Sequence, residues 1–294
     1  MTHYISRRRS SLAQAVARAA MVSVVATLAL AGCSQGASSA GKPGAEALPS
    51  AHVHGISRDP GSGMVNLATH EGLNVLQSDG SWKRVGPEVD LMSFAVSAPG
   101  TFYASGHPGA GVDLPQPVGL MKSTDAGATW TVLSRGGESD FHALAASSKG
   151  VMGFDNVALR ITPDGKTWSE GALSVSPTSL AAAPDGSRVL AATDQGLLSS
   201  TDDGRTWERL VSAPTLALAA FADSKTVVGV TYEGRLALSA DGGLTWRSDL
   251  ATLARGQALS ASRDKAGVLE ILVVTDKAIF QSRDNGASLS ELTS

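Results

Sequence analysis

The residues best suited to chemistry in this chain are its histidines, which gather in one part of the sequence. Beyond the N-terminal region they are His52, His54, His70, His107 and His142. Side chains two positions apart on a β-strand point to the same side, so the first two could reach one ion. Imidazole nitrogen ligates zinc at about 2.0–2.1 Å. The pattern predicts a transition-metal site for zinc or copper, with the other three histidines able to complete the shell.

Acidic residues accompany the histidines and allow other interpretations. The candidates for ligand binding are Glu71, Asp113, Asp140 and Asp155. Glu71 or Asp140 could act as a carboxylate ligand or as the partner of a ligating imidazole. Two alternatives to a metal site stay open: a hydrogen-bonded histidine cluster in a ligand pocket, and unrelated surface histidines.

A repeated motif indicates which elements position these residues. The pattern S-x-D-x-G-x-T-W is clear in the copies that end at Trp130, Trp207 and Trp246, and partial copies end at positions 82, 168 and 289. Successive copies are therefore 48, 38, 39, 39 and 43 residues apart. A period near 40 with several short strands per unit is typical of a propeller or a solenoid.

Each unit contains four short runs of apolar or alternating residues, separated by Asp-Gly turns. One unit reads Ser179–Ala183, Arg188–Ala192, Gly196–Ser200 and Thr206–Leu210. Such runs are typical of β-strands, and a four-stranded sheet repeated radially is the β-propeller. We therefore expect an all-β domain over residues 51–294, a six-bladed β-propeller with the motif in the turn between strands 3 and 4 of each blade.

The motif resembles the Asp-box of the sialidase superfamily, with its BNR and WD40/YVTN/BNR-like propellers. The histidine segments resemble those of a bacterial subset that is labelled glycosylhydrolase-like. The resemblance implies that Asp125, Asp202 and Asp241 lie opposite the substrate pocket. Their carboxylates can accept backbone N–H bonds that close the turn, and the tryptophan can pack between blades. We expect these aspartates to be structural.

Propeller topology also predicts where the histidines lie. The start of strand 1 and the loop between strands 2 and 3 open on the same face of a propeller. His52, His54 and His142 begin first strands, whereas His70 and His107 lie in strand 2–3 loops. All five therefore map to one face of blades 1–3. The long Gly/Pro-rich loop 106–118 is expected to form a rim or lid over this face.

Catalytic signatures argue for a binder over an enzyme. The Arg-Ile-Pro signature of sialidases is missing, and blade 1 opens with His-Val-His-Gly instead. The only Tyr-Glu pair, Tyr232-Glu233, lies in a loop. Other glycoside hydrolases need two suitably separated carboxylates, which the four acidic candidates could supply. The sequence thus favours a ligand-binding, metal-binding or assembly module, with a hydrolase of envelope or extracellular glycans as the alternative.

The N-terminal sequence predicts where the protein is located. Arg7–Arg9 precede an apolar stretch over residues 19–30, which is typical of a secretory signal and too short for a membrane span. Leu-Ala-Gly-Cys33 resembles the lipobox of bacterial lipoproteins, which implies lipidation of Cys33, the only cysteine. We expect a signal peptide over 1–32, a lipidated cysteine and flexible tether over 33–50, and anchoring on the extracytoplasmic side of the cell membrane.

Net charge narrows the range of partners. The first 32 residues hold four of the 24 basic residues and none of the 27 acidic ones, so the remaining chain carries a formal charge of −7. Nucleic-acid binding requires a basic face, which disfavours nucleic acid as a partner. The expected partners are the membrane, through the lipid, and an envelope protein complex or a glycan.

Overall fold

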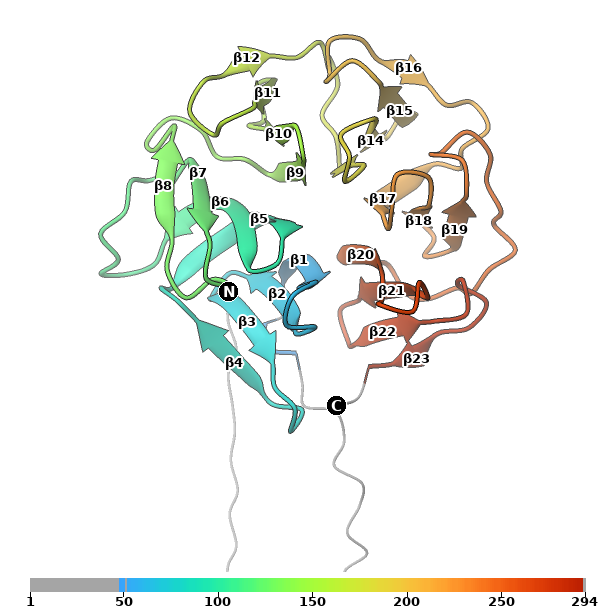
Figure 1. Ribbon diagram of the computed structural model, residues 1–294, viewed down its shortest axis with the longest axis horizontal. Coiled ribbons are helices and arrows are strands. Elements are labelled where there is room, and N and C mark those ends of the chain that lie inside the picture. The colour runs from blue at the N-terminus through green and yellow to red at the C-terminus, as the bar shows by residue number, and fades with distance from the viewer. Residues whose placement is uncertain (1–47, 51, 293–294) are drawn as a thin grey trace, which may run out of the picture. The chain divides into compact units, whose positions relative to one another are not determined.

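The protein is an all-β, six-bladed propeller, as the repeat period predicted. The computed structural model describes residues 48–50 and 52–292, and within these ranges 23 β-strands form six antiparallel sheets and no helix. Figure 1 shows the sheets arranged as blades around one axis. No described helix is long and apolar enough to cross a membrane. The expected signal peptide, Cys33 and the tether up to residue 47 lie outside the described residues.

Each sheet consists of strands that follow one another in sequence, with the first strand nearest the axis (Figure 1). The strands of blades 1 to 3 are β1 (Val53–Arg58), β2 (Val65–Thr69), β3 (Gly72–Leu76), β4 (Trp82–Val85), β5 (Val89–Ala98), β6 (Thr101–Pro108), β7 (Leu120–Ser123), β8 (Thr131–Ser134), β9 (Ala143–Ser147), β10 (Gly150–Phe154), β11 (Leu159–Thr162) and β12 (Ser169–Glu170). The strands of blades 4 to 6 are β13 (Ser179–Ala182), β14 (Val189–Thr193), β15 (Gly196–Ser200), β16 (Glu208–Arg209), β17 (Leu216–Phe221), β18 (Val227–Thr231), β19 (Leu236–Ser239), β20 (Ala258–Arg263), β21 (Leu269–Val274), β22 (Ile279–Ser282) and β23 (Ser290–Glu291).

Blade 5 differs from the expected four-stranded sheet. Its described strands are β17, β18 and β19, and the fourth position is reduced to isolated bridges such as Leu238–Arg247. Pairing with the edge of β19 is interrupted after Arg247 and resumes where Ala251 accepts from the Leu236 N–H. Leu250 and Leu253 pack against the core cluster of blades 5 and 6. Burial of these leucines replaces a regular fourth strand.

The hydrophobic core lies between the blades. In the described chain it forms six clusters, and each cluster is shared by two neighbouring blades. The tryptophans that end the turn motif pack at these junctions, as predicted. Trp168 of blade 3, for example, stacks on Phe141 with ring centroids 5.3 Å apart and joins the cluster shared with blade 2. The blades are therefore held together by side-chain burial.

The turn motif lies between the third and fourth strands and has a common hydrogen-bond pattern. In blade 5, the Gly243 N–H donates to Ser239 Oγ at 2.8 Å, while the N–H and hydroxyl of Thr245 donate to the Asp241 carboxylate at 2.8 and 2.6 Å. The glycine of the motif has positive φ, 88° at Gly127, and a Cβ there would overlap the Leu73 side chain of the preceding blade. These turns are structural, because their carboxylates bond to their own turn.

Candidate metal centre

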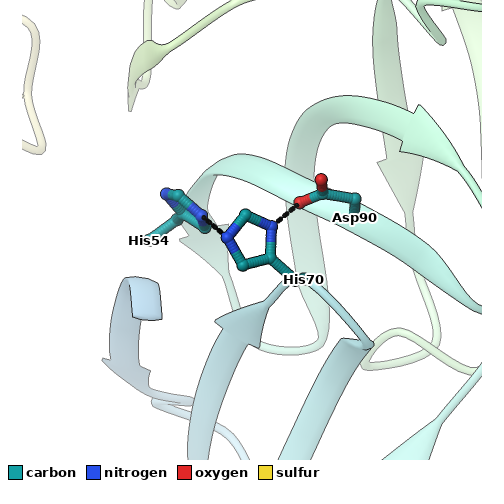
Figure 2. Close-up of side chains that lie close together, drawn as sticks. All are labelled: His54, His70 and Asp90. Carbon is teal, nitrogen blue, oxygen red and sulfur yellow. Dashed lines mark hydrogen bonds and ion pairs between the residues drawn. The ribbon is translucent and has the colours of Figure 1, made fainter. Parts of the chain in front are cut away.

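His70 is the centre of a group of three side chains that connects blades 1 and 2. It lies in the connection between β2 and β3, one residue beyond the end of β2. Its Nδ1 is 2.7 Å from Asp90 Oδ1, and its Nε2 is 3.4 Å from His54 Nε2. Figure 2 shows His70 between the other two side chains, with Asp90 on β5 and His54 on β1. The group therefore exists only where two blades meet.

The position of His54 follows from an irregularity in β1. Val53 pairs with Thr69 and Gly55 pairs with Ala68, so the register shifts and His54 is an extra residue on its strand. A bulge of this kind re-aims a side chain. The His54 ring meets the His70 ring edge to face, with centroids 4.7 Å apart and an angle of 83° between the planes.

The hydrogen bonds define which nitrogen of His70 is available to a ligand. Because a carboxylate only accepts, the Nδ1–H of His70 donates to Asp90. In the neutral ring, the lone pair is then on Nε2, which faces His54. An acidic partner on one nitrogen and a lone pair on the other is the arrangement found behind metal-ligating histidines. Asp90 therefore fits the role of orienting His70.

The distance between the two facing nitrogens suits a metal ion. Ligands bound tetrahedrally at 2.0–2.1 Å lie roughly 3.3–3.4 Å from one another. The observed separation of His54 Nε2 and His70 Nε2 is 3.4 Å. Among the described residues, His54, His70 and Asp90 are the group whose ligand atoms lie within 4.8 Å of one another. The residues present thus fit a divalent transition metal.

The electrostatics around His54 favour the neutral ring that a metal requires. Burial lowers the pKa of His54 below its usual 6.5, and the neighbouring His70 lowers it further, against an opposing effect of Asp90. The His70 and Asp90 side chains are 39% and 30% exposed. An ion could therefore enter from solvent and meet an uncharged imidazole.

A second histidine group lies one blade further along the ring, and in it a carboxylate lies between the two histidines. Both His107 Nε2 and His142 Nε2 face Asp140 Oδ2, at 3.2 and 2.6 Å. His107 Nδ1 and Asp140 Oδ1 are buried and have no hydrogen-bond partner within residues 52–292. The predicted ligands His107 and His142 are thus tied to Asp140 and do not join the group around His70.

The other predicted site residues lie in different surroundings. The His52 ring is exposed and meets the His70 ring edge on, with centroids 5.4 Å apart. Glu71 and Asp113 are exposed. The Asp155 side chain is 5% exposed; its carboxylate accepts from Arg160 at 3.1 Å and from Ser139 at 3.0 Å. Asp155 therefore already has partners within its own blade.

The long loop of blade 2 is anchored to the core. It runs from the end of β6 at Pro108 to β7, and Val112 and Leu114 pack against the cluster shared by blades 1 and 2. Val118 is fully buried. Asp113 lies between the two packed residues. This packing ties the loop to the core of the propeller.

Two cavities meet at His54. One, of about 520 Å³, is lined by His52 and His54 together with Tyr232, Arg255 and Asp276. The other, of about 220 Å³, follows the axis and is lined by the first strand of every blade and by His54. The candidate metal centre therefore borders the space at the centre of the ring.

Asp90 was missed by sequence reasoning, although a signal was available. Asp90 pairs with His107 across β5 and β6, and it occupies the start of strand 1 in blade 2. His52 and Asp140 come just before the first strands of blades 1 and 3. Applying the rule for strand starts to every blade, and to aspartate as well as histidine, would have identified it.

Comparison with known proteins supports the fold. No model of a known protein family matches the sequence, and no curated protein is similar to it. A gluconolactonase from Xanthomonas campestris has a TM-score of 0.60 at 11% identity, over 78% of this chain and 85% of that one. YCF48 from Cyanidioschyzon merolae has a TM-score of 0.52 at 14% identity, over 80% and 96% of the two chains.

An ancestral GH74 enzyme is also similar, with a TM-score of 0.53 at 13% identity over 82% of this chain. The present chain spans only 38% of the length of that enzyme. These neighbours are β-propellers, and at such identities the similarity shows the fold alone. A fold of this kind carries many unrelated functions, so function must be argued from the site.

Proposed function

We propose that this protein is a metal-binding module, in which one zinc or copper ion is held by Nε2 of His54 and of His70. The observation that carries the proposal is the 3.4 Å separation of the two nitrogens, with Asp90 bonded to the far side of His70. Imidazole suits both metals. Two protein ligands would leave further coordination positions open for a ligand or partner, and His54 also lines a cavity.

A metal titration tests this proposal. The chain is purified without a polyhistidine tag, stripped of metal and titrated by calorimetry with Zn²⁺ and, separately, Cu²⁺. We expect one ion per chain and more than about a 100-fold loss of affinity in His70→Ala, since loss of a ligand costs more than loss of its partner. A stoichiometry far below one ion per chain would contradict the proposal.

His142→Ala is the matched control. His142 lines the same axial cavity as His54, but its Nε2 is bonded to Asp140. The proposal expects this variant to bind metal like the unmodified chain. An equal loss in His142→Ala and His70→Ala would mean that the histidines act as one diffuse cluster.

We also propose a location and a class of partner for the protein, both argued from the sequence. Lipidation at Cys33 would anchor the propeller on the extracytoplasmic side, and metabolic labelling with palmitate that Cys33→Ser abolishes would support it. An envelope protein complex is the expected partner class. Among similar structures, YCF48 is bound to a D1 peptide. Pull-down from detergent-solubilised envelope, with and without metal, tests for such a partner.

Glycoside hydrolysis is the alternative function, and the contacts of the acidic candidates favour binding instead. Hydrolysis requires two available carboxylates across a sugar ring. Asp140 accepts hydrogen bonds from two histidines, and Asp155 accepts from Arg160 and Ser139. We expect no turnover of a panel of fluorogenic glycosides, sialosides included. Turnover that is lost in Asp140→Asn would support the hydrolase.

A further inference from the structure

Arg255 lines a cavity beside the candidate metal centre and forms no ion pair within the described residues. Arg255 lines the cavity of about 520 Å³ together with His52 and His54. Its side chain is exposed, and no residue of the described chain forms an ion pair or hydrogen bond with it. The guanidinium group therefore offers its donors to whatever enters the cavity.

Other arginines of the last blade behave differently. Arg263 pairs with Asp223 at 2.5 Å, and Arg283 contacts Glu270 at 3.3 Å. These contacts hold blades or strands together. Arg255 has no such structural role, although it lies close to Gln257, whose side chain accepts a bond from the backbone of Val53 in blade 1. Water solvates its exposed charge, and a ligand that enters the cavity could replace that water.

The lining of the same cavity also includes His54, one of the two proposed metal ligands. His54 lines the cavity, whereas Asp90 is engaged by the far nitrogen of His70. Zinc prefers four ligands, and a site with an incomplete protein shell takes a further ligand from solution. The cavity therefore joins a cation held by blade 1 to a second cation, Arg255, next to blade 6.

We propose that this cavity binds a small molecule through a carboxylate group that ligates the metal at His54 and pairs with Arg255. The inference rests on the proposed metal-binding function. Carboxylate oxygen is a zinc ligand at about 2.0–2.2 Å, and the planar guanidinium group matches the geometry of a carboxylate. Asp276 also lines the cavity, and its negative charge disfavours a dianion such as phosphate. A monocarboxylate is therefore the ligand class.

The test uses the full, untagged chain, loaded with zinc or stripped of it, titrated by calorimetry with benzoate, acetate and inorganic phosphate. We expect the carboxylates to bind the zinc-loaded chain at least about tenfold more tightly than the stripped chain, and more tightly than phosphate. Arg255→Gln is expected to weaken carboxylate binding by about tenfold or more, as loss of a charged hydrogen bond does. Its zinc affinity should not change.

Arg205→Gln is the matched control, because Arg205 is 72% exposed and lies outside the lining of this cavity. It should bind carboxylates like the unmodified chain. Zinc binding without carboxylate binding would overturn this inference and leave the metal function intact. Equal carboxylate affinity in Arg255→Gln, or phosphate binding as tight as carboxylate binding, would also overturn it. Failure of zinc itself to bind would reject both proposals, and the separate zinc titration identifies that case.

Discussion

At the scale of single residues, the account depends on His70 and on the carboxylate behind it. Asp90 accepts the Nδ1–H of His70 and so directs the Nε2 lone pair at His54. A negative partner also makes an imidazole a stronger ligand. Asp90 belongs to blade 2 and His70 to blade 1, so a contact between blades determines the chemistry of the site.

Replacing Asp90 tests this role. Asp90→Asn removes the negative charge while keeping the size of the side chain, and we expect metal affinity to fall about 10–100-fold, measured by calorimetry. Asp113→Asn is the control, because Asp113 is exposed on the loop of blade 2. Unchanged affinity in Asp90→Asn would show that the carboxylate does not prepare His70 for a metal.

The pH dependence of metal affinity gives a second residue-scale prediction. Protons compete with a metal for imidazole, so affinity falls when the ligands become charged. The pKa of His54 lies below its usual 6.5 because of burial and of His70. Protonation of His54 is therefore shifted to lower pH than that of an ordinary imidazole. Titrations at pH 7.5 and 5.5 are expected to give weaker metal binding at the lower pH, and equal affinity at both would contradict ligation by imidazole.

The sequence predicted the histidines of the site, but not that they would form two separate groups, one around His70 and one around Asp140. Strand order predicted that all five histidines lie on one face, and in the structure His54 and His142 line the axial cavity while His70 contacts His54. Strand order could not show that His107 and His142 would form hydrogen bonds with Asp140. That choice depends on rotamers and on the bulge at His54, which a residue pattern does not encode.

At the scale of elements, the turns between third and fourth strands make the blades sensitive to acid. Hydrogen bonds to the neighbouring hydroxyl and backbone N–H lower the pKa of Asp125, Asp164, Asp202, Asp241 and Asp284 to about 2, from a usual value of 3.8. A carboxyl group whose pKa is lower in the folded state than in the unfolded state stabilises the fold, and this contribution is complete at pH values above the unfolded-state pKa. This stability is lost as the pH falls through the folded value.

We therefore expect the melting temperature to fall as the pH drops from about 4 to about 2, followed by circular dichroism. Asp241→Asn should lower the melting temperature at neutral pH and reduce its dependence on acid, because the Thr245 bonds to the carboxylate are weakened. Asp249→Asn is the control, since that carboxylate is 80% exposed and is 3.5 Å from Arg247. Equal acid dependence in both variants would mean that the turns do not control it.

Most strands could be predicted from the sequence because alternation and Asp-Gly turns are local signals. Gly196–Ser200, for example, is a strand with the expected bounds. The missing fourth strand of blade 5 could not be predicted. Only the packing between blades 5 and 6 shows that Leu250 and Leu253 are buried there and that pairing with β19 is reduced to isolated bridges.

At the scale of the whole molecule, contacts between side chains and one bond from the Val53 N–H to the Gln257 side chain join the first and last blades within the described residues. Each sheet is made from one continuous stretch of chain, so no strand passes between the first and last blades. Figure 1 shows these blades side by side, and Val53 and Leu67 share a buried cluster with Leu272 of blade 6. Beside it, Glu270, whose side chain is 2% exposed, pairs with Arg58 of blade 1.

Removing the negative charge of Glu270 should weaken the contact between blades 1 and 6. Glu270→Gln leaves Arg58 without its carboxylate in a buried setting, and we expect a loss of about 3 kcal/mol in the free energy of unfolding, measured with denaturant. Glu88→Gln is the control, because its pair with Arg84 is about half exposed and should change stability by less than about 1 kcal/mol. Similar losses in the two variants would show that the closure does not depend on Glu270.

The most direct test of the central claim is anomalous diffraction from crystals of the zinc-loaded chain, recorded on both sides of the zinc absorption edge. The account predicts one strong anomalous peak per chain, about 2.0–2.1 Å from Nε2 of both His54 and His70, with Asp90 still bonded to His70. A peak that contacts Asp140 instead, or no peak between the two imidazoles at full zinc loading, would contradict it.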